Sequence, residues 1–277
     1  MYSAPETRIR RSDRMRANAQ WAVITGASSG IGRALAVEFA SAGFNVWLAG
    51  RNRVALDEAA AECAATGVET DVVAADLATP AGVDTMIAAL RAEPRQISIL
   101  ANNAGFGLHG GFAATPPETA VDMIHVQLTA AVRLTRHLLP AMIERRDGRI
   151  LIVASVYSFS PVPYQSIYGA SKAFLSSWAS ALGNELQGSG VTVTLYCPGT
   201  TQTAFRSRAG IGQKRSDSGM TAAEVAKIGV WATLGGRHVV VPGFWNRLFV
   251  LVTRHAPVRL VPRIVRIINR KRGQNHT

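Results

Sequence analysis

Short apolar runs alternate with longer amphipathic blocks along most of the chain. The apolar runs are rich in Val, Ile, Leu and Ala, a composition typical of strands that are buried on both faces. They lie at 21–25, 45–49, 71–75, 97–101, 149–154, 191–196 and 238–242. The blocks between them predict a helix that ends near residue 42 and further helices at 54–65, 80–92, 117–145, 166–187 and 221–234. This alternation predicts an α/β fold.

Charge divides the chain into three regions. Residues 1–20 carry five Arg and two acids, and residues 244–277 carry seven Arg, one Lys and no acid. Residues 21–243 are nearly neutral, with 17 basic and 16 acidic residues. We therefore expect a disordered basic arm at 1–20, one domain at 21–243 and a basic amphipathic helical extension at 244–277. Few aromatic residues accompany the terminal arginines, so we expect no specific nucleic-acid binding.

The cysteines and the apolar segments favour a cytoplasmic protein. Residues 1–20 lack the apolar segment of a secretory signal, and no run reaches the ~18 apolar residues that a spanning helix needs. Two cysteines, Cys63 and Cys197, cannot build a disulfide framework, which fits a reducing compartment. Neither has a metal-ligating neighbour at a useful spacing, so we expect two core residues and no metal site.

A glycine-rich stretch follows the first strand and opens the first helix. Gly26 permits a tight turn, while Gly30 and Gly32 let the backbone approach a ligand and the helix approach the sheet. The helix N-terminus offers N–H groups and the positive end of a dipole to a pyrophosphate. A strand, glycines and a helix in this order predict a dinucleotide site. Its expected contacts include the residues between these glycines, Ser28, Ser29 and Ile31.

The loop after the second strand indicates which dinucleotide is bound. About twenty residues beyond the glycines, a carboxylate would bind the ribose 2′-hydroxyl of NAD. Arg51 stands there instead, and its loop contains no acid. A guanidinium suits a 2′-phosphate, so we predict NADP(H) as the cofactor. A solvent-exposed loop arginine is the alternative interpretation.

The segment 155–172 carries the candidate chemistry. Tyr168 and Lys172 are four residues apart on a predicted helix, so their side chains share one face. A phenol has a pKa of about 10, and an ammonium close to it would lower that value. Ser155 ends the preceding strand and could hydrogen-bond a substrate oxygen. Together they predict proton transfer to or from an alcohol or carbonyl oxygen, although a Tyr-x-x-x-Lys spacing alone is common by chance.

These motifs and others occur in an order that matches a known family. They are Thr25-Gly26-x-x-x-Gly30-x-Gly32, Asn102-Asn103-Ala104-Gly105, Ser155, Tyr168-x-x-x-Lys172 and Pro198-Gly199-x-x-x-Thr203. On them the chain resembles the short-chain dehydrogenases/reductases over about residues 20–243, and most of all the bacterial ketone or 3-oxoacyl reductases. The resemblance implies a Rossmann-type, doubly wound, mostly parallel sheet of about seven strands with helices on both faces. We also expect a homo-oligomer, a dimer or a tetramer.

The resemblance implies roles for single residues as well. Tyr168 would be the acid and base, Ser155 would orient the substrate oxygen, and Lys172 would bind the nicotinamide ribose and lower the pKa of Tyr168. Asp76 would face the adenine. The remaining cofactor contacts would be Leu77, Asn102, Ala104, Gly105, Pro198, Gly199 and Thr203.

One position departs from the family's pattern. Twenty-eight residues before the serine, where the family usually has an asparagine that helps hold a proton-relay water, this chain has Gln127. The amide is kept, but the extra methylene displaces it by about one bond length. We expect either a relay through a shifted water or slow turnover. An NADP-binding sensor or scaffold with vestigial catalysis therefore stands as the alternative to an active enzyme.

The candidate substrate pocket is apolar. Its expected rim is Phe106, Leu108, Phe159, Pro161, Val162, Tyr164 and Phe205. This rim favours a hydrophobic ketone or aldehyde, and its alcohol, over a small anion. The polar, glycine-containing segment 204–220 lacks a clear periodicity and predicts a mobile lid.

Two further helices are expected after Gly243. The first covers 244–255, Pro257 ends it, and the second begins near Val261. A helical wheel gives the second helix an apolar face of Val261, Ile264, Val265 and Ile268, and an opposite face of Arg259, Arg263, Arg266 and Arg270. The apolar face either docks on the protein or a partner subunit, or lies on an anionic membrane surface, at the inner face of the membrane.

Overall fold

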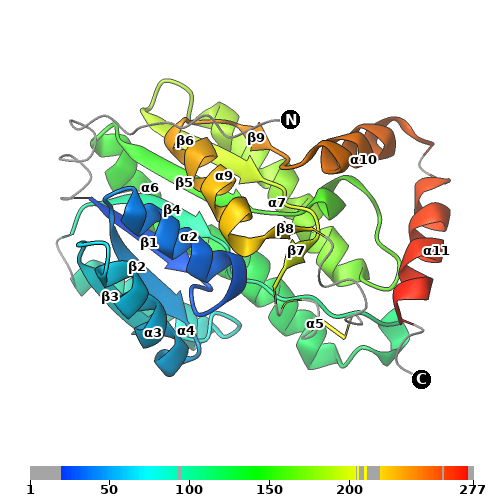
Figure 1. Cartoon of the computed structure of the whole chain (residues 1–277), viewed down its shortest axis with the longest axis horizontal. Coiled ribbons are helices and arrows are strands. Elements are labelled where there is room, and N and C mark those ends of the chain that lie inside the picture. Colours follow the sequence, from blue (N-terminus) through cyan, green and yellow to red (C-terminus); the bar gives the residue numbers. More distant parts are fainter. Residues whose placement is uncertain are drawn as a thin grey trace.

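Seven parallel strands form one sheet in the computed structural model of the protein. The structure describes residues 20–92, 95–203, 205, 209–210, 219–257 and 259–273. The strands are β1 (Trp21–Thr25), β2 (Asn45–Gly50), β3 (Thr70–Ala74), β4 (Ile97–Asn102), β5 (Gly148–Val153), β6 (Val191–Tyr196) and β9 (Val239–Val240). Their order is β3-β2-β1-β4-β5-β6-β9, and every pairing is parallel (Figure 1). The predicted doubly wound sheet is confirmed.

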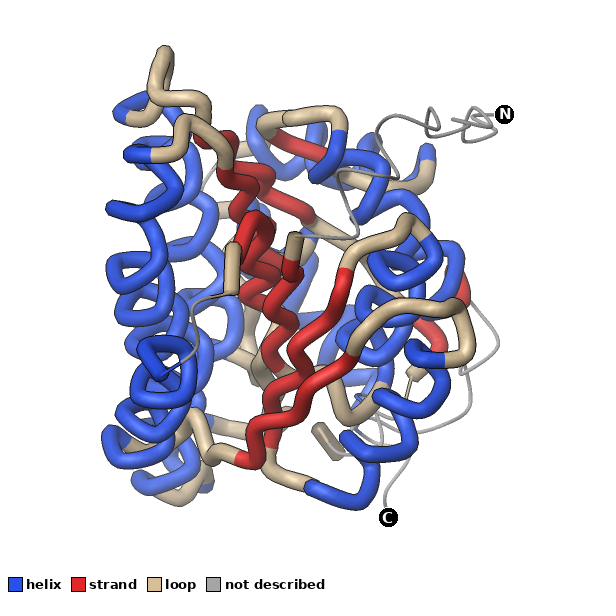
Figure 2. Tube along the Cα trace, turned by 90° about the vertical axis from the view of Figure 1, so that its left-hand side faces the viewer, coloured by secondary structure: helices blue, strands red, loops and turns tan. Residues whose placement is uncertain are grey.

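Helices cover both faces of this sheet, and each face has its own core. The helices are α2 (Gly30–Ser41), α3 (Arg53–Ala64), α4 (Pro80–Ala92), α6 (Ala130–Glu144), α7 (Ser166–Glu185) and α9 (Ala222–Leu234). One core contains residues of α2, α3 and α9, and the other contains residues of α4, α6 and α7 (Figure 2). Ile24 of β1 enters the first core and Val23 enters the second. Because both faces of the central strands are covered, their sequences are apolar rather than alternating.

The strand order reverses between β1 and β4, and this reversal positions the candidate site. In open α/β sheets, ligands bind outside the carboxyl ends of the strands at such a switch point. The loops after β1, β4, β5 and β6 contain, respectively, the glycine-rich stretch, Asn103, Ser155 and Pro198. The fold thus brings the separate sequence motifs to one edge of the sheet.

The middle of the chain departs from the sequence prediction. One helix is predicted over 117–145, whereas the structure has α5 (Pro117–Ile124), a π-helical segment His125–Thr129 and then α6. The amide of Ala130 donates to the carbonyl of His125, five residues back, and this spacing defines the π turn. Single π turns inside helices are frequent at functional sites, and Gln127 lies in this one.

The structure contains several short elements that the sequence does not predict. Unpredicted are the short helices η1 (Phe112–Ala114) and η3 (Val156–Phe159) and the strands β7 (Thr201–Gln202) and β8 (Met220–Thr221). The last strand of the sheet is shorter than the predicted 238–242. The predicted lid at 204–220 lies largely outside the described residues, and so does the arm at 1–20 except for Gln20.

Both cysteines are core residues, as the sequence predicts. Cys63 and Cys197 are buried free thiols, one in each core. Burial raises the pKa of each thiol to about 12, which keeps both protonated and unreactive at neutral pH.

The C-terminal extension forms the two predicted helices, α10 (Phe244–His255) and α11 (Val261–Gly273). In Figure 1 they lie at the right, outside the layers that enclose the sheet. Val261 and Val265 of α11 are buried against Val162, so this part of the predicted apolar face docks on the protein. Ile264, however, is 49% exposed, and the side chain of Ile268 lies outside the description.

The arginines of α11 that the structure describes face solvent, as the helical wheel predicts. Arg263 and Arg266 are exposed, as is Arg259 just before the helix. Among the described residues, no helix has the length and apolar character that a membrane crossing requires.

Gly32 provides a test of how tightly the glycine loop packs. Alanine is better than glycine in a helix interior by about 1 kcal/mol, but a Cβ here would collide with the carbonyl oxygen of Gly26. We expect Gly32→Ala to lower the free energy of unfolding in urea by about 1–3 kcal/mol or more, because overpacking outweighs helix propensity. Gly110→Ala is the control, since its Cβ would meet nothing within 4 Å. Equal stability of the two variants would contradict the tight packing.

Candidate active site

The three residues that the sequence singles out for proton chemistry meet at the end of β5. Ser155 follows this strand and caps η3, where its Oγ accepts a hydrogen bond from the Tyr157 amide at 3.2 Å. Tyr168 and Lys172 lie in the first turns of α7. All three side chains are buried, and the Ser155 hydroxyl lies close enough to the Tyr168 phenol to lower its pKa. The predicted grouping of the three residues is therefore found.

The ammonium group of Lys172 is held by the backbone. Its Nζ donates to the carbonyl of Val153 at 3.0 Å and lies 5.6 Å from the centroid of the Tyr168 ring. No carboxylate of the described residues forms an ion pair with it. Burial therefore acts on an almost uncompensated charge and lowers the pKa of Lys172 to about 8.

The phenol of Tyr168 differs from the sequence prediction. Lys172 is expected to lower its pKa, whereas the structure gives a pKa raised to about 12. Burial raises it, and the hydrogen bond with Ser155 offsets this only in part. At neutral pH Tyr168 is thus a protonated phenol, a form that can donate a proton.

Gln127 lies beside this group in the π-helical segment. Its Nε2 donates to the carbonyls of Phe106 at 3.2 Å and Met123 at 3.4 Å. Its Oε1 is buried and has no hydrogen-bond partner among the described residues. A Cβ on Gly105 would lie 3.0 Å from Cγ of Gln127, so a side chain at position 105 would press on the glutamine.

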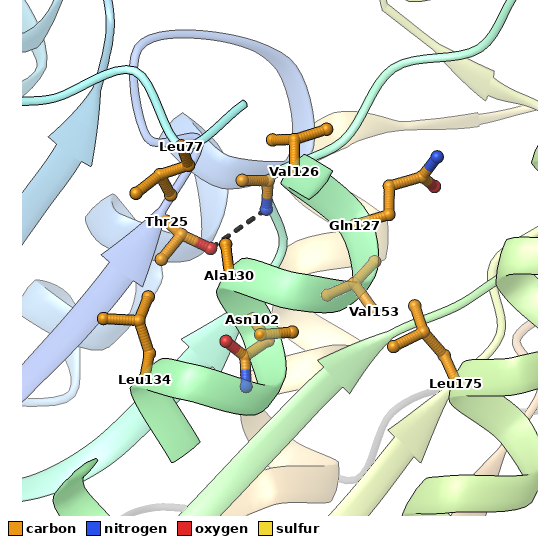
Figure 3. A pocket seen from close by; sticks show the side chains of 11 residues that line it. Thr25, Leu77, Asn102, Val126, Gln127, Ala130, Leu134, Val153 and Leu175 are labelled. Atoms are coloured by element: carbon orange, nitrogen blue, oxygen red, sulfur yellow. Dashed lines mark hydrogen bonds between the residues drawn. The ribbon is translucent and has the colours of Figure 1, made fainter. Parts of the chain in front are cut away.

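A small cavity of about 10 Å³ lies between Gln127 and the end of β1 (Figure 3). This volume is close to what one water molecule needs. Leu77 and Asn102 also line it, and the Oδ1 of Asn102 is a second buried oxygen without a partner in the described structure. In Figure 3 the amide of Gln127 points away from Asn102, so the two orphaned oxygens face different sides of this region.

The loops after β1 and β4 are tied to each other. Thr25 Oγ1 accepts hydrogen bonds from the amides of Asn103 and Ala104, both at 3.0 Å. Asn103 Nδ2 donates to the Thr25 carbonyl at 2.9 Å. Asn103 belongs to the quoted motif but is missing from the predicted site, and its side chain braces the turn rather than facing a ligand.

The glycine loop has the geometry that a close backbone approach requires. Gly26 and Gly30 have φ values of +69° and +58°, a left-handed region that disfavours side chains. Between and after them, the predicted contacts Ser28, Ser29 and Ile31 are partly exposed. A Cβ on Gly30 would stand 3.4 Å from Thr203, so this side of the loop faces the segment after β6. The loop is therefore open to a ligand at the N-terminus of α2.

Two further predicted cofactor contacts, Arg51 and Asp76, lie in the loops after β2 and β3. Arg51 follows β2, is exposed, and forms no ion pair with any described residue, whereas Arg53 pairs with Asp57 at 2.9 Å. Asp76 follows β3 closely, and its Oδ1 accepts from the Ala78 amide at 3.1 Å. Arg51 is thus the arginine of this loop that is available for an anion.

The segment after β6 contacts both the site and the C-terminal extension. Pro198 is buried, and a Cβ on Gly199 would collide with the side chain of Asn246 in α10. The ring of Phe205, a predicted rim residue, has its centroid 5.7 Å from that of Tyr168. The apolar rim therefore reaches the candidate catalytic phenol on this side.

Helix α11 contacts the loop before α7, which contains the predicted rim residues Pro161, Val162 and Tyr164 and which we term the substrate-side loop. No sequence pattern indicates this contact. Asn269 of α11 is fully buried, its Nδ2 donates to the Pro163 carbonyl at 3.0 Å, and its carbonyl lies 3.1 Å from His109 Nε2. His109 stacks on Tyr164, whose φ of +68° is unusual for a non-glycine residue. The helical wheel ranks only apolar and charged positions, so it gave no sign of this asparagine.

The described residues contain no group of His, Cys, Asp and Glu side chains that could hold a metal ion. A glycine-rich dinucleotide loop at a switch point, beside a buried Ser–Tyr–Lys group, defines a class of nucleotide-dependent α/β proteins.

The comparisons with known proteins assign the chain to one family in this class. A family profile described as short chain dehydrogenase matches residues 20–214. A very-long-chain 3-oxoacyl-CoA reductase of Phaeosphaeria nodorum is 39% identical over 178 residues, 62% of this chain and 52% of the relative. The chain thus spans about half the length of this curated relative.

Two solved structures match over most of both chains. The short-chain dehydrogenase from Sphingobium yanoikuyae in complex with NADPH is 34% identical, with a TM-score of 0.77, over 83% of this chain and 92% of that one. The bulky-bulky ketone specific alcohol dehydrogenase from Comamonas testosteroni is 29% identical, with a TM-score of 0.73, over 88% and 100%. The chain belongs to the short-chain dehydrogenase family.

The low pKa of Lys172 can be measured directly. The chain has four lysines, so lysine labelled with ¹³C at Cε gives four resonances, and Lys172→Arg identifies one. We expect the Lys172 resonance to titrate near pH 8, well below the ordinary lysine value of about 10.5. Titration of the Lys172 resonance near 10.5 would contradict the burial of its charge.

The same shift has a consequence for stability. Between pH 8 and 10.5 Lys172 binds a proton in the unfolded chain but not in the folded one. The free energy of unfolding therefore increases as pH rises through this window, and this gain is lost again as pH falls back to 8. Comparison with Lys172→Met over the same pH range should isolate this contribution.

Proposed function

We propose that this protein is an NADP(H)-dependent oxidoreductase that interconverts a hydrophobic ketone or aldehyde and its alcohol. The observation that carries the proposal is the buried group of Ser155, Tyr168 and Lys172 beside an open glycine loop. Membership of the short-chain dehydrogenase family supports it, as do relatives whose names specify 3-oxoacyl-CoA or ketone substrates. Bound cofactor would supply or accept the hydride.

The chain's own residues account for the proton. We assign Tyr168 as the acid that protonates the carbonyl oxygen during reduction, since burial keeps its phenol protonated. Ser155, whose hydroxyl lies close to the same phenol, orients the carbonyl oxygen of the substrate. Lys172 returns a proton to Tyr168, because burial lowers its pKa to about 8 and makes its ammonium a better acid than usual. Its other predicted partner is the nicotinamide ribose.

Gln127 completes the route by which the lysine is reprotonated. Its orphaned Oε1 has a free acceptor site for a relay water, which supports the relay through a shifted water that the sequence predicts. The alternative, an NADP-binding sensor or scaffold, is favoured only by this glutamine in place of the family's asparagine. NADPH binding with no NADPH oxidation on any carbonyl compound would support that alternative.

The residues around the dinucleotide loop fit NADP(H). The left-handed glycines leave room for a pyrophosphate, and Arg51 is exposed without an acidic partner in the described structure. The Sphingobium yanoikuyae structure holds NADPH. We assign to the cofactor Gly26, Ser28, Ser29, Gly30, Ile31, Gly32, Arg51, Asp76, Leu77, Asn102, Ala104, Gly105, Tyr168, Lys172, Pro198, Gly199 and Thr203.

The substrate class follows from the apolar rim. Val162 is buried under α11, and Phe205 packs on the Tyr168 ring. A panel of aliphatic 3-oxoacyl thioesters, bulky ketones and polar sugars, with NADPH oxidation as readout, tests the class. We expect the apolar compounds to be reduced with the higher kcat/KM. A homo-oligomer and a cytoplasmic location stay expectations from the sequence.

Removal of the Tyr168 hydroxyl tests the proton donor. We expect Tyr168→Phe to lower kcat by about 10²–10⁴-fold, the usual contribution of a general acid, while the Kd for NADPH changes little. The control is Tyr157→Phe, which keeps the ring contact with Phe249 and should leave kcat near normal. Near-normal turnover by Tyr168→Phe would exclude the proposed mechanism.

A charge reversal at Arg51 tests the cofactor assignment. Charge-assisted hydrogen bonds to a phosphate are worth about 1.5–3 kcal/mol each, so Arg51→Asp should weaken NADPH binding by at least about tenfold and favour NADH. Arg53→Gln serves as the control, because Arg53 is engaged with Asp57. Fluorescence titration with both cofactors gives the two constants. Equal affinities of the unmutated protein for NADPH and NADH would refute the assignment.

A further inference from the structure

Exposed apolar side chains gather on the C-terminal extension. Half of the large apolar residues that are exposed in the described chain belong to residues 244–267. These eight are Phe244, Trp245, Leu248, Leu251, Val252, Leu260, Ile264 and Ile267. Trp245 and Phe244 are 77% and 72% exposed, more than any of the other exposed apolar residues. Scattered apolar residues need no explanation, but a continuous patch marks an interaction surface.

The orientation of α10 shows that this patch is a face and not a frayed end. At 100° per residue, Asn246, Phe249, Val250 and Thr253 fall on one side of the helix, and these contact the protein. Val250 is buried, and Phe249 packs edge-on against Tyr157. The five exposed apolar residues of α10 fall on the opposite side. The helix therefore turns its apolar stripe away from the domain that carries it.

The orientation of α11 is fixed by its inner face. Val261 and Val265 pack on Val162, and Asn269 is bonded to the Pro163 carbonyl. With this face docked, Ile264 and Ile267 point outward beside Arg263 and Arg266. The outer faces of α10 and α11 together form what we term the C-terminal surface.

The positive charge of the C-terminal surface indicates what kind of partner it binds. Exposed arginines at 247, 254, 259, 263 and 266 accompany the apolar residues, and residues 244–277 contain no acid. In a twofold symmetric contact with a second copy, the same patch meets itself, so these arginines would face one another. An anionic bilayer provides both an apolar layer for the side chains and negative headgroups for the arginines. Tryptophan beside basic residues is typical of a membrane interface.

We infer that the C-terminal surface lies on an anionic bilayer. The inference rests on the proposed function, because a membrane location would serve a hydrophobic substrate. The inner faces of α10 and α11 border the candidate active site. Asn269 holds Pro163 in the substrate-side loop, and Asn246 lies against Gly199 in the loop after β6. A hydrophobic carbonyl compound dissolved in the bilayer would thus reach the apolar rim from the surface on which the protein rests.

Co-sedimentation of the full chain with vesicles tests the inference. The vesicles are phosphatidylcholine alone and phosphatidylcholine mixed with phosphatidylglycerol, each at low and at high salt. We expect binding to the mixed vesicles that salt weakens. Phe244→Ser/Trp245→Ser/Leu251→Ser should reduce it by more than about a hundredfold, because three exposed apolar side chains leave the bilayer. Val54→Ser/Ile143→Ser, which removes exposed apolar residues of α3 and α6, should bind like the unmutated chain.

A second pair of variants tests the charge. Arg263→Gln/Arg266→Gln should weaken binding to the mixed vesicles by about thirtyfold, at about 1 kcal/mol for each basic side chain near an anionic surface. Arg91→Gln/Arg136→Gln, with two exposed arginines on other helices, is the matched control.

The outcomes separate this inference from the proposed function. Activity of the triple serine variant on a water-soluble ketone should stay normal, since α10 contributes no residue that touches the reacting atoms. Equal binding of all variants, or no binding by the unmutated chain, would overturn the membrane surface and leave the reductase proposal intact. A fall in oligomer size by light scattering in the triple variant, without any vesicle binding, would assign the surface to a second copy instead.

Discussion

A buried ammonium without a carboxylate partner is the constraint on which the site depends. Lys172 is held by the Val153 carbonyl, and no acid of the described residues neutralises it. Moving such a charge out of water is costly, and the reduced pKa of Lys172 records this cost. The sheet can carry it because β5 is paired on both sides and places that carbonyl firmly at its end. A stable fold thus supports a locally unfavourable group whose proton is easily released.

The same burial gives Tyr168 and Lys172 opposite tendencies. The phenol is driven toward its neutral, protonated form, and the ammonium is driven to lose its proton. The proposed proton donor and the group proposed to resupply it therefore lie about one turn apart on α7. This arrangement is suited to reduction near neutral pH, where Tyr168 starts protonated. Ser155 joins them because the capping of η3 directs its hydroxyl into the same region.

The sequence predicts those parts of the structure that local patterns determine. The strands of the sheet are rich in apolar residues, so the sequence predicts all seven. The Gly26–Gly32 loop predicts a dinucleotide site at the turn after β1. The π turn at Gln127 was missed because it depends on one displaced hydrogen bond, which no hydrophobic periodicity reports. Asn269 was missed because its partner, Pro163, is distant in sequence. The sign of the Tyr168 pKa shift was wrong because spacing reveals a neighbouring charge but not the depth of burial.

The fate of the hydride tests whether this protein reduces a carbonyl compound. NADPH deuterated at its transferable position should be incubated with a hydrophobic ketone and the chain, and the alcohol examined by mass spectrometry and NMR. We predict one deuterium on the carbinol carbon, and a transfer that is slowed by about 10²–10⁴-fold in Tyr168→Phe. Tight NADPH binding without any deuterated alcohol, across the whole ketone panel, would contradict it and would point to a cofactor-binding sensor.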